Sequence, residues 1–155
     1  MLVYDSIEIP EPYDAVLDTL KSVGGEIQVW ASAAYRRGEG MAVGPAPLVS
    51  APIELEVGAP MRSLESTTIP MSWIASSASG LFPRMDAEVV ISQLNVSDTQ
   101  LEFRGSYRPP LEGFGRILDR LAFHRLAEST VRNFLDRLAQ AVVAEVRARR
   151  PAAGE

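Results

Sequence analysis

The chain has 155 residues, of which 46% are hydrophobic and 23% are charged, as in an ordinary globular domain. It contains no cysteine, which excludes disulfides, thiolate catalysis and cysteine-ligated metals. The net charge is −5, and the arginines after residue 103 are interleaved with acidic side chains, which argues against nucleic-acid binding. No apolar run is long enough to span a bilayer and no secretory signal is present, so we expect a cytoplasmic protein without stable membrane insertion.

The first third of the chain predicts a strand followed by short helices. Residues 2–10 are rich in Val, Ile and Tyr, which favours a strand. Residues 11–25 have apolar side chains at helical spacing after a proline and stop at two glycines. Residues 26–38 fit a second short helix. Residues 38–47 form a loop rich in Gly and Pro, whose glycine spacing matches neither a P-loop nor a dinucleotide site.

The middle of the chain predicts an antiparallel meander with one solvent-exposed face. Residues 52–57, 66–76, 86–94 and 99–108 read as strands, because apolar and polar side chains alternate along most of them. Pro70 predicts an edge or a bulge in the second of these strands. The residues expected on the inner face of the second and fourth strands are Thr67, Ile69, Met71, Trp73, Leu101, Phe103, Gly105 and Tyr107.

Residues 116–147 contain no helix breaker and predict one helix about 48 Å long, at 1.5 Å per residue. With a rotation of 100° per residue, its apolar side chains form one stripe on the helix surface. The members of this stripe are Ile117, Leu121, Val131, Leu135, Leu138, Val142 and Val146. Leu126 falls on the far side.

His124, the only histidine of the chain, and Glu128 fall close to the centre of this apolar stripe. An ionised carboxylate in a dry core costs roughly several kcal/mol unless it is paired or neutralised. One interpretation is a satisfied polar patch, in which the two side chains pair with each other or with groups on the strands. The other interpretation is an internal cavity that holds water or a ligand next to them.

The order of predicted elements is one strand, one or two short helices, several antiparallel strands and a long C-terminal helix. This order resembles the helix-grip or SRPBCC superfamily, which includes START-like lipid carriers, birch-pollen allergen-type proteins and polyketide cyclases. The resemblance is carried by "IEIPEPYDAVLDTL" near the start and "LEFRGSYRPPLEGFGRILDRLAFHRLAESTVRNFLDRL" near the end. It implies an α+β fold in which a curved antiparallel sheet wraps around the long helix. We therefore expect one domain over residues 1–150 and a disordered tail at 151–155.

The resemblance also implies an apolar pocket between the sheet and the helix. We expect its ligand-binding residues to be His124, Glu128, Val131, Leu135, Tyr107, Phe103, Trp73 and Met71. Methionines 41, 61 and 85 are further candidates for an adaptable wall.

Two functions follow from such a pocket, and a third depends on the outer surface of the long helix instead. The first is the binding or transport of a small hydrophobic molecule such as a lipid, polyketide or isoprenoid. The second is a cyclase- or dehydratase-like enzyme, with His124 as acid or base, Glu128 as its orienter and Tyr107 as a donor to a carbonyl. The third is a homodimeric interaction module. We expect no cofactor and no metal, because one histidine and one glutamate supply at most two ligands.

Overall fold

The computed structural model describes residues 1–22, 53–75, 84–108 and 118–150. Its elements, in chain order, are β1 (Leu2–Ile9), α1 (Tyr13–Ser22), β2 (Ile53–Val57), β3 (Met61–Arg62), β4 (Ser66–Ala75), β5 (Met85–Gln93), β6 (Thr99–Tyr107) and α3 (Leu118–Arg149). The helix predicted over residues 26–38, the loop at 38–47, Met41 and the tail at 151–155 lie outside the described residues. None of the helices in the described part of the chain is long and apolar enough to cross a membrane.

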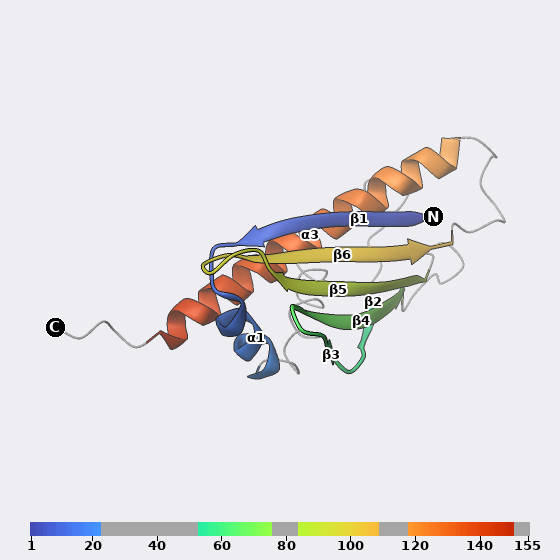
Figure 1. Ribbon diagram of the computed structural model, residues 1–155. Helices are drawn as coiled ribbons and strands as arrows, with labels where there is room; N and C mark the ends of the chain where they lie inside the picture. Colours follow the sequence, from blue (N-terminus) through green and yellow to red (C-terminus); the bar gives the residue numbers. More distant parts are fainter. Residues whose placement is uncertain (23–52, 76–83, 109–117, 151–155) are drawn as a thin grey trace.

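The strands form one antiparallel sheet of six strands (Figure 1). The order across the sheet is β1-β6-β5-β4-β2, and β3 pairs with β4 beyond the end of β2. Phe103 in β6 pairs with Asp5 in β1 and with Val89 in β5, which fixes the register at the centre of the sheet. Side chains alternate between the two faces, so Leu101, Phe103 and Tyr107 are buried while Arg104 and Ser106 are exposed. The predicted meander is confirmed.

Pro70 lies inside the sheet, so of the two predicted alternatives, an edge or a bulge, the edge is wrong. It pairs with Glu88 of β5 on one side. On its other side the ladder is broken, because the β2 pairing ends at Met71 and the β3 pairing begins at Thr68. Proline has no N–H to give to a ladder, so it fits opposite this interruption. The Pro70 carbonyl accepts a hydrogen bond of 2.8 Å from the N–H of Gly58.

The two helices of the described residues, α1 and α3, pack on the apolar face of the sheet. α3 crosses the sheet obliquely, packing mainly on the edge strand β1 with a smaller contact to β6, and α1 lies beside its C-terminal half (Figure 1). The buried stripe of α3 contains Val131, Leu135, Leu138, Val142 and Val146, as the sequence predicts. Together with the sheet they form one continuous apolar core.

This architecture is the predicted α+β helix-grip fold: a curved antiparallel sheet holding a long C-terminal helix. The helix has 32 residues and is about 48 Å long, whereas β1 and β6 have eight and nine residues and are about 30 Å long. α3 therefore extends beyond the sheet, and in Figure 1 its first turns lie past β1. This overhang determines the surroundings of the candidate site.

Candidate functional site

Three polar side chains form a hydrogen-bonded chain where β6 meets the N-terminal half of α3. The Tyr107 hydroxyl lies 3.4 Å from Nδ1 of His124, and Nε2 of His124 lies 3.3 Å from Oε1 of Glu128. The Tyr107 hydroxyl also lies 3.4 Å from Sδ of Met1. The pairing at i,i+4 that the sequence allows is therefore present, and it is joined to the sheet through Tyr107.

Exposure increases along this chain of three side chains. Tyr107 is 3% exposed, whereas the side chains of His124 and Glu128 are 33% and 51% exposed. Burial, and to a lesser degree the negative charge of Glu128, raise the pKa of the Tyr107 hydroxyl above its usual range. Tyr107 is thus a neutral hydrogen-bond donor, and Glu128 connects it through His124 to the solvent.

The helical position predicted for His124 and Glu128 is right, but these two side chains are more exposed than an enclosed polar pair would be. They lie on the same side of α3 as Val131 and Leu135, which are 0% and 1% exposed. Both residues belong to the N-terminal half of α3, whose first turns extend past β1 in Figure 1. The pair therefore lies at the rim of the core.

The other predicted site residues lie together in the core below this rim. Val131, Leu135, Phe103, Tyr107, Trp73 and Met71 all belong to the continuous apolar cluster. The ring centroids of Trp73 and Phe103 are 5.5 Å apart and tilted by 34°, a favourable offset arrangement. Two strands and one helix thus bring the predicted wall residues together.

Phe134 of α3 joins this buried cluster, and the sequence pattern did not predict it. Its ring centroid lies 6.1 Å from that of Trp73 and 6.0 Å from that of Phe103, so the three rings form a triangle. On the helix it is rotated by about 100° from the line through Ile117 that defined the apolar stripe. An aromatic side chain at the flank of a stripe was the signal that could have identified it.

Gly105 provides the space that Phe103 occupies. A Cβ at this position would lie 2.6 Å from Cε1 of Phe103 and 3.0 Å from Sδ of Met85. The Phe103 ring therefore lies over the glycine, next to Met85, which is 4% exposed. Met85 belongs to the buried apolar core. Met61 does not, because it is 58% exposed on β3, and its predicted role as a wall is wrong.

The opposite end of α3 is attached to the sheet by a buried carboxylate. Glu11, between β1 and α1, is 3% exposed, and its two oxygens contact Nε of Arg147 at 3.1 Å and a guanidinium nitrogen of Arg150 at 2.6 Å. Its backbone carbonyl accepts a hydrogen bond of 2.8 Å from the hydroxyl of Thr99, and Arg149 donates to Ser22. The two ends of α3 thus differ: one is held by ion pairs to a buried group, and the other carries the half-exposed polar chain.

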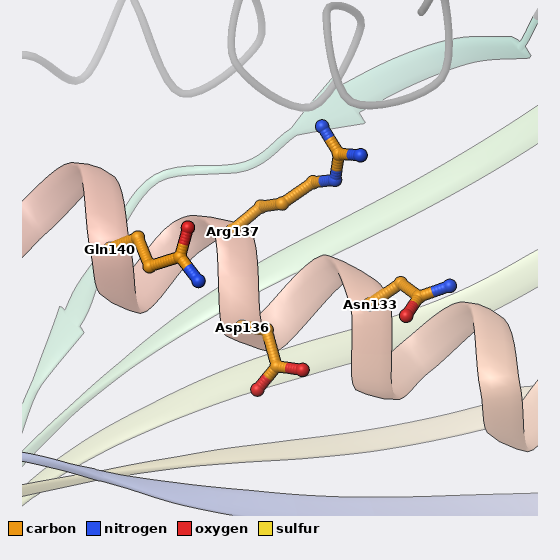
Figure 2. Close-up of a pocket in the computed structure, with 4 residues that line it drawn as sticks. All are labelled: Asn133, Asp136, Arg137 and Gln140. Carbon is orange, nitrogen blue, oxygen red and sulfur yellow. The ribbon is translucent and has the colours of Figure 1, made fainter. Parts of the chain in front are cut away.

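A polar groove of about 400 Å³ lies along α3. Figure 2 shows the side chains that line it, Asn133, Asp136, Arg137 and Gln140, along successive turns of the helix. They lie on the side of α3 opposite the buried stripe, at 100° per residue. Their chemistry does not suit an apolar ligand, and we interpret this groove as part of the solvated face of the helix.

The described residues contain no group of three or more His, Cys, Asp or Glu side chains that could hold a metal ion. The predictions that the protein uses no metal and no cofactor stay predictions.

No protein-family model matches the chain, and no curated sequence is significantly similar to it. Solved structures resemble it in fold. A hypothetical protein from Helicobacter pylori aligns over 92% of this chain and 88% of its own, with a TM-score of 0.57 and 10% identity. Ara h 8.0201 aligns over 93% of this chain and 98% of its own, with a TM-score of 0.54 and 8% identity. An aromatase/cyclase from Streptomyces aligns over 99% and 98% at 14% identity, but its TM-score of 0.49 is too low to bear on function.

These likenesses and the arrangement of sheet and helix identify the architecture. The chain has the helix-grip fold, as the order of its elements predicts. At such low identity the likeness defines the fold alone, so function has to be argued from the site.

Proposed function

We propose that this protein binds a small, mostly apolar molecule with an aromatic ring between α3 and the part of the sheet formed by β4, β5 and β6. The observation that carries the proposal is the wall itself. Two aromatic rings of the sheet and one of α3 lie close together, and Met71 and Met85 belong to the same buried cluster. Aromatic side chains offer flat stacking surfaces, and methionine adapts its shape to different ligands.

The position of α3 supports a ligand in this part of the core. The backbone of α3 lies mainly on β1, and it reaches the Trp73 ring on β4 through the side chain of Phe134. A ring inserted between Trp73 and Phe134 would replace one aromatic contact by two. Such a ligand requires the buried Phe134 side chain to move away from Trp73.

The polar chain at the rim supports a ligand with one polar end. A bound ring that extends from Trp73 toward the end of β6 reaches Tyr107, whose neutral hydroxyl can donate to an oxygen of the ligand. A few polar groups at the edge of an apolar wall orient a ligand in this way. The preferred ligand is therefore aromatic and carries a carbonyl or hydroxyl oxygen.

Transport and storage are the activities that such a pocket serves directly. We place the protein in the cytoplasm and assign it no cofactor. The homodimeric interaction module that the sequence left open predicts a particle of twice the chain mass, which light scattering of the purified protein measures.

The test is direct binding of 2-tetralone, an aromatic ketone, by isothermal titration calorimetry. Wild-type protein should bind it, and Phe134→Leu should weaken the binding about two- to tenfold through loss of one ring contact. Val96→Ala is the matched control, because Val96 is 87% exposed on the turn between β5 and β6. Absence of binding, or equal weakening by both variants, would contradict the proposal.

A further inference from the structure

β1 forms one edge of the sheet in the described part of the chain, where its only strand partner is β6 (Figure 1). The register between the two strands runs one to one over all eight residues of β1, so no bulge interrupts the strand. β1 also contains no proline and no lysine, which many edge strands use to prevent pairing with other chains. It is therefore a long, regular strand with one side open to pairing. We call this side the β1 edge.

The backbone groups at the β1 edge can be assigned from the ladder with β6. The backbone nitrogen of Met1 donates to the carbonyl of Tyr107 at 2.6 Å, and the N–H of Tyr107 donates to the carbonyl of Met1 at 2.9 Å. Opposite residues of antiparallel strands alternate between bonded and non-bonded pairs, so every second residue from Val3 to Ile9 is bonded to β6. The N–H and C=O groups at the β1 edge therefore belong to Leu2, Tyr4, Ser6 and Glu8.

The contacts of Ser6 support this assignment. Its N–H donates a hydrogen bond of 2.9 Å to Oδ1 of Asp5, a side chain, rather than to a carbonyl of β6. Oδ2 of Asp5 lies 3.3 Å from Nε of Arg132 on α3. The Ser6 N–H thus has a local acceptor, which the carbonyl of another chain can replace.

We propose that the β1 edge binds an extended segment of a different protein as an additional strand. Main-chain hydrogen bonds to every second residue of β1 supply the pairing, as in other proteins that add a peptide to the edge of a sheet. All strand pairs of this sheet are antiparallel, which favours the same direction for the added strand. The β1 edge lies outside the proposed apolar pocket, and the inference does not depend on that pocket.

The exposed side chains of β1 define the chemistry of this segment. Leu2 and Tyr4 are 80% and 59% exposed, so apolar side chains opposite them would cover apolar surface. Glu8 is exposed, and it has no ion pair with any residue that the structure describes. A Lys or Arg opposite Glu8 would supply an opposite charge. In an antiparallel strand, this basic residue lies near the amino end of the segment and the apolar residues near its carboxyl end.

The charge of Asp5 argues against a second copy of this chain on the β1 edge. Two β1 strands paired antiparallel over their whole length would place Leu2 opposite Glu8 and each Asp5 opposite the Asp5 of the other copy. Like charges directly opposite each other are destabilising. A Ser or Thr of a different segment can instead donate a hydrogen bond to this carboxylate. Asp5 therefore favours a different protein over a second copy.

The test uses a capped synthetic heptapeptide, Lys-Val-Thr-Ser-Tyr-Thr-Leu, with binding measured by isothermal titration calorimetry. Its Lys is matched to Glu8, its Ser to Asp5 and its Leu to Leu2. Wild-type protein should bind it, and Ser6→Ala, which keeps the backbone N–H, should change the affinity less than about twofold. Ser6→Pro removes only an N–H of the β1 edge, a place where strands tolerate proline, and should weaken binding about tenfold or more.

A charge exchange tests the direction of the added strand. Glu8→Lys should weaken binding of this peptide about two- to fivefold. The same variant should bind more tightly a peptide in which Glu replaces Lys. Glu54→Lys is the matched control, because Glu54 is also exposed but lies on β2, at the other side of the sheet, and it should leave both affinities unchanged.

Hydrogen–deuterium exchange of the wild-type backbone amides, followed by NMR, tests the inference without any variant. The bound peptide should slow exchange at the N–H groups of the β1 edge, which are those of Leu2, Tyr4, Ser6 and Glu8. Absence of peptide binding, protection confined to other residues, or equal affinity of Ser6→Ala and Ser6→Pro would overturn the inference. So would a wild-type particle of twice the chain mass that Ser6→Pro converts to single chains, because the occupant would then be a second copy.

Discussion

Replacing the partners of Glu11 should destabilise the protein more than replacing Glu11 itself. The carboxylate is 3% exposed, while Arg147 and Arg150, which pair with it, are each 61% exposed. In Glu11→Gln both guanidinium groups keep their contact with water, so the loss is that of hydrogen bonds to a charged group. We expect a decrease in the free energy of unfolding of about 1.5–3 kcal/mol.

The double variant Arg147→Gln, Arg150→Gln removes both cations and leaves a buried carboxylate without an ionic partner. Removing the partners of a buried charge lowers the free energy of unfolding by roughly 3–5 kcal/mol. Urea denaturation followed by circular dichroism measures both losses. The m-value, which is the slope of the free energy of unfolding against urea concentration, should stay constant among the variants. The triple variant with Gln at all three positions should be more stable than the double variant, because the unpaired charge is gone.

The control for this series is Lys21→Gln. Lys21 pairs with Asp18 at 3.5 Å on the surface of α1, where both side chains are more than half exposed, so stability should hardly change. A double arginine variant that loses no more stability than Glu11→Gln would refute the reasoning. It would mean that Glu11 reaches water in the folded state.

Three further predictions concern the candidate site. Gly105→Ala should cost about 1–3 kcal/mol, because the added methyl meets the Phe103 ring, and Phe103→Leu in the same chain should recover part of this loss in urea denaturation. The pKa of Tyr107 is raised on folding, so the neutral hydroxyl adds stability that is lost as the pH rises above about 10. Tyr107→Phe should abolish this part of the alkaline loss, and an unchanged alkaline profile would contradict the burial argument. His124→Leu should leave folding intact and weaken the binding of 2-tetralone by about 0.5–1.5 kcal/mol; strong destabilisation with unchanged affinity would make His124 structural.

The alternation of side chains was enough to predict the sheet and its buried face. Leu101, Phe103 and Tyr107 had to point to the same face of the sheet in any strand. A sheet with one solvent-exposed face indicated antiparallel strands. The apolar stripe likewise predicted which side of α3 is buried. These features depend on neighbours close in sequence, so they can be read from the chain alone.

Features set by distant contacts could not be read in the same way. A helical wheel gives the direction of His124 but not whether the sheet extends beneath it, so the half-exposed rim was not foreseen. Phe134 was missed because its partners, Trp73 and Phe103, lie on other elements. The ion pair between Glu11 and Arg147 joins residues 136 positions apart, and no local pattern marks it.

The most direct test of the pocket is carbon-13 methyl NMR during titration with 2-tetralone. We expect shifts for methyl groups of the proposed wall: Met71, Met85, Val131 and Leu135. The internal controls are the exposed methyl groups of Met61, Leu64, Leu94 and Val96, which should stay in place. Shifts confined to these exposed methyls, or no shifts at all at saturating 2-tetralone, would contradict a ligand site between the sheet and α3.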